Sequence, residues 1–134
     1  MRTVGVGYDG SPDSETALRW AAHLAQALGA RLIVVHAVGL LEESGLARRA
    51  PPSPARATAL AVDSGLPQDR VEWLALEGPP ADALLRATEA PHGVDLLVVG
   101  TRGEAQHAGV ILGSTSLAVA ERANVPVVIV PAPA

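Results

Sequence analysis

Glycines and hydroxyl side chains that could bind phosphate gather in one stretch of the chain. They are Gly100, Gly103, Gly113, Ser114, Thr115 and Ser116. A glycine lets the main chain approach a ligand closely, and a helix that begins after Gly113 would direct its free N–H groups and positive dipole end at a phosphate. The spacing therefore predicts an anion-binding loop, although the same glycines would also suit tight turns that bind nothing.

A second polar group follows the first apolar run, at residues 4–8. Asp9 ends this run, and Ser11 and Pro12 are the residue types that cap and open a helix. The carboxylate of Asp9 could approach a ligand, or it could accept hydrogen bonds from the main-chain amides of its own turn. The sequence leaves both roles open.

The composition excludes several kinds of chemistry. All 10 basic residues are arginine, and the chain contains neither lysine nor cysteine. Schiff-base catalysis, a phosphate loop with its lysine, a thiolate nucleophile and a thiolate zinc site are therefore ruled out. The formal net charge of −4, without a cluster of basic residues, also argues against nucleic acid as a partner.

Histidine and tryptophan offer little further chemistry. The 4 histidines do not have the spacing of metal ligands, so we expect no metal site made by protein side chains alone. His36 lies within an apolar run and is expected to be a core residue. We expect Trp20 and Trp73 to be packing residues rather than platforms on which a base stacks.

Strand-like apolar runs alternate with helical patterns along the whole chain. The strand-like runs occupy residues 4–8, 32–38, 71–76, 95–99 and 127–130. Helical spacing with start or stop residues predicts helices over residues 12–28, 54–64, 80–90 and 114–123. The alternation predicts a single α/β domain over residues 1–134, with a doubly wound, five-stranded parallel sheet of order 3-2-1-4-5 and helices on both faces.

The predicted strand order brings the two polar segments together. In such a sheet, ligands bind beyond the carboxyl ends of the strands, at the point where the strand order reverses. That point lies between the first and fourth strands, so the turn at Asp9 and the glycine-rich stretch after Val99 would meet there.

The apolar runs are too short to cross a membrane. The longest have five to seven residues, whereas a transmembrane helix needs about 20. The first residues also lack the hydrophobic region of a signal peptide. We therefore expect a cytoplasmic protein with no membrane partner.

Other functions known for similar sheets fit the sequence less well. A hydrolase of this type would need a G-x-S-x-G elbow, which the sequence lacks. A response-regulator receiver would need a lysine and an acidic cluster beside Asp9. A flavodoxin-like electron carrier would need aromatic side chains to stack on the flavin, and only Tyr8 is available.

The glycine spacing matches a family signature. Gly100-x-x-Gly103 is followed, after nine residues, by Gly113-Ser114. This is the G-2x-G-9x-G-S/T pattern of the universal stress proteins that bind ATP, and the chain resembles that family over essentially its whole length. Residues 8–11, 33–38, 77–81 and 125–130 are similar to the family's first strand ending, second strand, third-helix entry and last strand.

The resemblance implies a site for an adenine nucleotide, ATP or else ADP or AMP. The residues implied to hold the phosphates and ribose are Gly100, Gly103, Gly113, Ser114 and Thr115. Asp9 would lie near the nucleotide, through the ribose or through a bound Mg²⁺. Ala37 would offer its main chain to adenine, and Val99 would flank the pocket.

Three positions depart from the family's pattern. Arg102 stands where members often have histidine, Glu104 where they have a basic residue, and Gln106 where many have glycine. A carboxylate beside a triphosphate weakens binding, and Arg102 would compensate in part. We therefore expect a lower affinity for ATP than in a typical member, with AMP or ADP competing well.

The implied function is that of an ATP-binding regulatory protein of the stress response, without dedicated catalysis, although the sequence leaves slow ATP hydrolysis open. The alternative is a dimeric interaction scaffold of the same family, with weak or no nucleotide binding.

Val127–Val130 is short, β-branched and uncharged, and it lies at an edge of the predicted sheet. Its unpaired main-chain groups favour a homodimer through this strand, as is common in the family.

Overall fold

The protein is an α/β domain built on one parallel sheet. The computed structural model describes residues 2–39, 52–101 and 113–131. The strands are β1 (Thr3–Gly7), β2 (Arg31–Val38), β3 (Val71–Glu77), β4 (Leu96–Gly100) and β5 (Val127–Val130). All neighbouring pairs are parallel, and the order is β3-β2-β1-β4-β5. This confirms the predicted sheet, with strand boundaries within about one residue of those expected.

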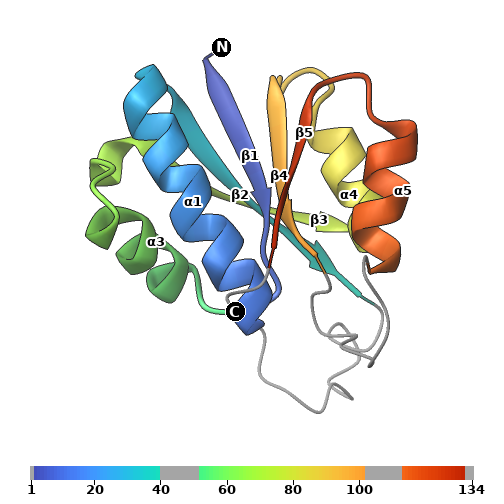
Figure 1. Cartoon of the computed structure of the whole chain (residues 1–134), viewed down its shortest axis with the longest axis horizontal. Helices are drawn as coiled ribbons and strands as arrows, with labels where there is room; N and C mark the ends of the chain where they lie inside the picture. Colours follow the sequence, from blue (N-terminus) through green and yellow to red (C-terminus); the bar gives the residue numbers. More distant parts are fainter. Residues whose placement is uncertain (1, 40–51, 102–112, 132–134) are drawn as a thin grey trace.

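Helices cover both faces of the sheet. They are α1 (Pro12–Leu28), α3 (Pro54–Asp63), α4 (Pro80–Ala87) and α5 (Ser114–Arg122), with a 3₁₀ turn at Gln68–Arg70 that the sequence did not predict. Figure 1 shows α1 and α3 on one face and α4 and α5 on the other, as expected for a doubly wound fold. Within the described residues, no helix is long and apolar enough to cross a membrane.

Local signals define the ends of α1. The Ser11 side chain accepts a hydrogen bond from the main-chain N–H of Ser14, and Pro12 occupies the first turn. Gly29 ends the helix with a φ of 66°, in the left-handed region that favours glycine. These are the same residues from which the helix was predicted.

Two hydrophobic cores lie on opposite faces of the sheet because side chains alternate along each strand. The core under α1 and α3 includes Val4, Val6, Leu32, Val34 and Val98. The core under α4 and α5 includes Ile33, Val35, Leu97, Val99 and Val119. The inner strands β1, β2 and β4 are therefore buried on both sides, which explains their near-continuous apolar sequences.

Glycines in β1 allow α4 and its connection to lie close to the sheet. A Cβ added to Gly5 would lie 2.9 Å from Cγ1 of Val94, and one added to Gly7 would lie 3.1 Å from Cδ1 of Leu84. β1 can thus sit at the centre of the sheet only with small residues on this face. The apolar pattern of the strand did not predict this requirement.

Candidate functional site

The candidate site lies at the carboxyl ends of β1 and β4, the two strands between which the sheet order reverses. β1 pairs with β2 on one side and β4 on the other. The turn after β1 leads into α1, and the main-chain N–H of Gly113 donates to the carbonyl of Thr101, just after β4. The start of α5 is thereby joined to the end of β4, and both belong to the glycine-rich stretch that the sequence analysis placed at this end of the sheet.

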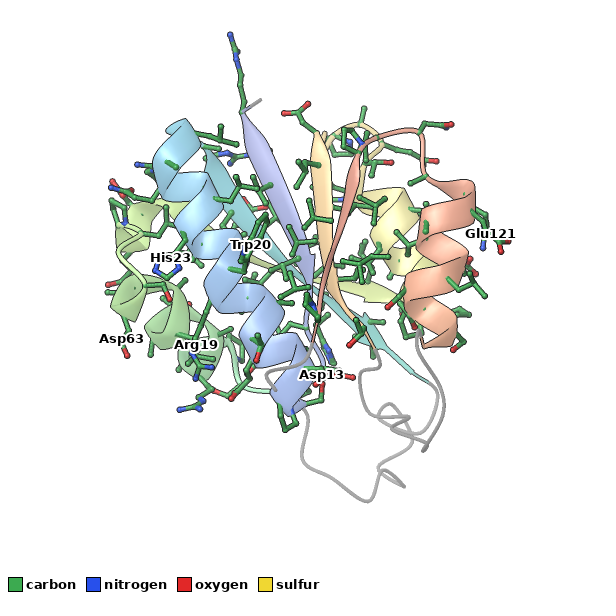
Figure 2. The ribbon with its side chains drawn as sticks, in the orientation of Figure 1. Asp13, Arg19, Trp20, His23, Asp63 and Glu121 are labelled. Carbon is green, nitrogen blue, oxygen red and sulfur yellow. The ribbon has the colours of Figure 1, made fainter. Side chains whose placement is uncertain are left out.

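Gly100 lies against the first turn of α1. A Cβ at this position would lie 2.9 Å from the main-chain oxygen of Asp13 and 3.3 Å from its Cβ. Asp13 is buried, and Figure 2 shows it at the end of the sheet where the site lies. The packing of α1 on β4 therefore requires glycine at position 100, whether or not a ligand also does.

The beginning of α5 has the features of an anion-binding helix end. Gly113 is the N-cap residue, and as a glycine it has no side chain with which to cap the first turn. Gly113 is buried, whereas Ser114 is exposed and Thr115 is half-buried. The N–H groups of such a first turn and the positive end of the helix dipole are the features that attract a negatively charged group.

Ser116 joins α5 to the end of β4, a structural role that its position in the sequence does not predict. Its side chain is buried, and its hydroxyl donates to the carbonyl oxygens of Gly100, at 2.5 Å, and Thr101, at 3.3 Å. The expectation that this hydroxyl serves a ligand, like those of Ser114 and Thr115, is not supported by these contacts. Ser116 instead holds the first turn of α5 against the end of β4.

Asp9 organises the turn between β1 and α1. Its Oδ1 accepts a hydrogen bond from the main-chain N–H of Ser11 at 2.9 Å, and its own N–H donates to Oγ of Ser14 at 3.3 Å. Asp9 is half-buried. Of the two roles left open, the structural one is therefore present, and it places the carboxylate in the turn that leads from the carboxyl end of β1 into α1.

Ala37 and Val99 lie in neighbouring parts of the same sheet end. The pairing of β1 with β2 ends at Gly7 and Val35, whereas β2 continues to Val38 alongside β3. Ala37 therefore lies beyond the end of β1, with one side of its main chain facing the site. The side chain of Val99 is buried in the core under α4 and α5, so Val99 can flank a pocket only through its main chain.

A polar network joins β1, α1 and α3 beside the site. The Tyr8 hydroxyl donates to Oε2 of Glu15 at 3.1 Å, and Arg56 donates to both carboxylate oxygens of Glu15 from Nε and Nη2, each at 3.1 Å. Burial, together with the adjacent Glu15 carboxylate, raises the pKa of Tyr8 to about 12. The hydrogen bond from Arg56 lowers the pKa of Glu15, against the opposing effect of burial.

This network gave no signal in the sequence. Glu15 and Arg56 are 41 residues apart, and each is an ordinary polar residue of a helix in the linear pattern. Only the packing of α3 beside α1 brings them together. The network ties the start of α3 to the turn that carries Asp9.

The aromatic residues divide between the interior and the surface. His36 is buried and its ring lies 5.5 Å from that of Trp73, which also contacts Tyr8 edge-on at 6.2 Å. The expected packing roles of His36 and Trp73 are confirmed. The expectation for Trp20 is wrong, because 41% of Trp20 is exposed.

Some predicted features lie outside the described residues. They are Gly103, Arg102, Glu104 and Gln106. Within the part of the chain that the structure describes, no group of three or more histidine, aspartate or glutamate side chains could hold a metal ion. Any metal at this end of the sheet would therefore need ligands from a bound molecule or from the remaining residues.

The structure defines a doubly wound α/β protein in which a helix, α5, begins at the switch point of the sheet. The model of the universal stress protein family matches residues 1–131, and the chain belongs to that family. A relative from Thermus aquaticus, described as the universal stress protein in the QAH/OAS sulfhydrylase 3′ region, is 37% identical over 97% of this chain and 98% of its own.

Further relatives and structures agree with this assignment. The universal stress protein Rv2005c of Mycobacterium tuberculosis is 35% identical over 94% of this chain, which spans only 44% of that longer protein. A universal stress protein solved in complex with cAMP is 33% identical, with a TM-score of 0.76 and 98% of both chains covered. The hypothetical protein MJ0577 shares the fold, with a TM-score of 0.79 at 20% identity.

Proposed function

We propose that this protein binds an adenine nucleotide, ATP in the first instance, at the carboxyl ends of β1 and β4 and acts as a regulatory universal stress protein. The observation that carries the proposal is the start of α5, which begins at a glycine N-cap and is hydrogen-bonded to the residue after Gly100. The similarity to a universal stress protein in complex with cAMP supports an adenine nucleotide as the ligand.

In this proposal, phosphates lie against the first turn of α5. The main-chain N–H groups of Ser114 and Thr115 point along the helix axis, and the exposed Ser114 hydroxyl adds a donor beside them. The main chain of Gly100, Gly103 and Gly113 completes the phosphate and ribose contacts. Ser116, which is already bonded to Gly100, holds the donors in position rather than contacting the ligand.

The nucleoside would occupy the space beyond the end of β1. There the main chain of Ala37 is offered to adenine, the main chain of Val99 flanks it, and Asp9 lies near the ribose or a Mg²⁺ ion carried by the phosphates. Because Asp9 Oδ1 already accepts the N–H of Ser11, the other carboxylate oxygen is the one that we assign to this contact.

The proposed role involves no dedicated catalysis. Carboxylates at this end of the sheet, Asp9 and Asp13, would repel added negative charge, which favours nucleotides with fewer phosphates when no Mg²⁺ is present. We therefore expect Mg²⁺ to improve the binding of ATP more than that of AMP or cAMP. Cytoplasmic location and a single domain over residues 1–134 remain part of the proposal.

Calorimetry with ATP, ADP, AMP and cAMP, each with and without Mg²⁺, tests this proposal. Gly113→Val would place a branched side chain at the start of α5 and should abolish binding. Ala59→Val adds the same side chain on the exposed part of α3, so it should bind like the parent. Equal heats for the Gly113 variant and the parent, or no heat with any nucleotide, would contradict the proposal.

A second candidate function is a dimeric interaction scaffold with weak or no nucleotide binding. It is favoured by β5, an edge strand with no charged residue. We propose a homodimer through Val127–Val130 in either case. Light scattering at micromolar concentration should then give twice the chain mass of 13.7 kDa, with nucleotide binding deciding between the two functions.

A further inference from the structure

The two edges of the sheet differ in charge. β3 carries Glu72 and Glu77, both exposed, and Glu72 forms an ion pair with Arg31 at 3.7 Å. β5 has only valine and isoleucine, between Pro126 and Pro131. Charged residues protect an edge strand from pairing with another strand. The β3 edge is therefore protected along its length, and the β5 edge is protected only at its ends.

Strand pairing alone would make a very small interface. Four residues of strand are about 13 Å long, and a sheet layer is about 10 Å thick, so the edge offers on the order of 130 Å². A stable interface needs about 800 Å² on each partner. The helices that flank β5 must therefore supply most of the contact area if β5 forms a lasting interface.

Both helices beside β5 carry a large apolar side chain that is exposed. Trp20 of α1 is 41% exposed and Leu117 of α5 is 48% exposed. Within the described residues the other large apolar side chains of comparable exposure are Leu28, in the last turn of α1, and Val62 of α3. Tryptophan is one of the residue types enriched among those that dominate binding energy at interfaces.

Trp20 lies on the flank of α1 that faces away from α3. Glu15 marks the flank toward α3, because it is bound by Arg56. Five residues further along a helix corresponds to a rotation of about 140°, so Trp20 is on the other side. α1 contacts β5 there, and Figure 2 shows Trp20 on the side of α1 toward β1 and β5.

Trp20 is also at the level of β5 along the sheet. Asp13 lies against Gly100, whose partner in β5 is Val130. Trp20 is seven residues further along α1, a distance of about 10 Å. Three residues of strand cover a similar length, so Trp20 is level with Val127.

The same argument places Leu117 beside the edge on the opposite face of the sheet. Arg122 of α5 forms an ion pair with Asp82 of α4 at 2.9 Å, which marks the flank of α5 that faces α4. Leu117 is five residues before Arg122 and therefore about 140° away around the helix. The neighbouring Ser116 is bonded to Gly100, the partner of Val130, so Leu117 lies near the carboxyl end of β5.

We propose that Trp20 and Leu117 supply the main apolar contacts of a two-fold interface with a second copy of this chain. One of the two side chains lies on each face of the sheet. This inference rests on the proposed homodimer and names its energetic centre. A two-fold axis perpendicular to the sheet makes the two β5 strands antiparallel and keeps α1 beside the partner's α1. Each apolar side chain is then covered by the equivalent layer of the other copy.

A second copy fits this surface better than an unrelated strand does. In the two-fold pairing, each copy uses its single uncharged edge, and the remaining outer edges are the two charged β3 strands. The assembly therefore closes at two chains without leaving an open apolar edge. An unrelated partner would have to match apolar contacts on both faces of the sheet as well as the strand.

The test compares Trp20→Arg, Leu117→Arg and Val62→Arg by sedimentation equilibrium. All three positions are exposed to a similar extent, so each variant should fold, which circular dichroism checks. We expect a dimeric parent, an increase of at least about 30-fold in the dimer dissociation constant for Trp20→Arg and Leu117→Arg, and no change for Val62→Arg, which lies on α3 away from β5.

The outcomes separate this inference from the proposed homodimer. A monomeric parent at high concentration would overturn both. A dimeric parent whose dissociation constant is unchanged by Trp20→Arg and Leu117→Arg would leave the homodimer standing and overturn the role of these two side chains. If only Val62→Arg lost the dimer, the interface would lie on the α3 side of the molecule. That result would also overturn the proposed role of Trp20 and Leu117.

Discussion

Gly100 and Asp13 lie so close together that the position of a Cβ on Gly100 is 2.9 Å from the main-chain oxygen of Asp13. A backbone atom cannot move aside as the end of a long side chain can. One glycine of the family signature is therefore required by the packing of α1 on β4. The same close approach brings the turn of Asp9 next to the start of α5, where we propose that phosphate binds.

Gly100→Ala should consequently affect stability as well as binding. The added methyl group must push the first turn of α1 away from β4, at a cost of about 1–3 kcal/mol in the free energy of unfolding. Urea denaturation measures this loss. Binding of ATP should weaken too, because Ser14 in the displaced turn accepts a hydrogen bond from the main-chain N–H of Asp9. A Gly100→Ala variant with unchanged stability would show that α1 can shift without cost.

Alanine variants of Ser116 and Ser114 should have different effects, the first on the stability of the protein and the second on nucleotide binding. Ser116→Ala removes the buried hydroxyl that bonds to Gly100 and Thr101, and it should lower the free energy of unfolding by about 1–3 kcal/mol. Ser114→Ala removes an exposed hydroxyl at the proposed phosphate position, so it should weaken nucleotide binding and leave stability nearly unchanged. Denaturation and calorimetry on both variants would show the opposite pattern if Ser116 contacted the ligand.

The Glu15 carboxylate should make the free energy of unfolding fall as the pH is lowered. Its folded-state pKa is lowered from 4.5, chiefly by the hydrogen bond from Arg56. A group with a depressed pKa contributes stability above its unfolded pKa, and that contribution is lost as the pH falls through the folded value. Glu15→Gln should therefore be less stable than the parent at pH 7 and closer to it at pH 3.

Glu89→Gln is the control for this comparison. Glu89 is exposed beyond the end of α4, far from the network. Thermal unfolding at pH 7 and pH 3 should be the same for this variant as for the parent. An equal difference between Glu15→Gln and the parent at both pH values would mean that the charge of Glu15 is not what stabilises the network.

Tyr8 should make the free energy of unfolding fall as the pH is raised above the usual tyrosine range. Its pKa is raised to about 12, mainly by burial, whereas an unfolded tyrosine titrates near about 10. The contribution to stability is complete below the unfolded pKa and disappears as the pH rises through about 12.

Tyr8→Phe removes this titration. Denaturation between about pH 9 and 12 should then show a smaller loss of stability than in the parent, because no phenolate has to form in the core. The absorbance of tyrosinate provides a direct measurement, since Tyr8 is the single tyrosine of the chain. A spectroscopic midpoint near 10 in the folded protein would refute the raised pKa.

Much of the fold followed from local signals in the sequence. Ser11, Pro12 and Gly29 mark the ends of α1 through capping and a left-handed turn, and these effects need no distant partner. The uninterrupted apolar run of β2 predicted a strand buried on both faces, and strand–helix alternation limited the sheet to the observed order. The 3₁₀ turn at Gln68–Arg70 was missed because it has no periodic pattern.

The sequence predicted where the residues of the candidate site lie, but not the role of each residue. The glycine and hydroxyl types at positions 100 and 113–116 pointed to the sheet end where they are found. They could not distinguish Ser114, which is exposed, from Ser116, which is buried against Gly100. Both are serines in the first turn of one helix, and their different roles depend on which side of α5 faces the sheet.

Periodicity, capping residues and glycine spacing are local properties of the chain, and they were enough to predict the parallel sheet, its two helical layers and the family. Three contacts or exposures could be seen only in the folded chain: Asp13 packs against Gly100, Arg56 binds Glu15, and Trp20 lies at the surface. Each of these depends on how two elements, distant in sequence, rotate and pack against each other. No pattern within one helix contains that information.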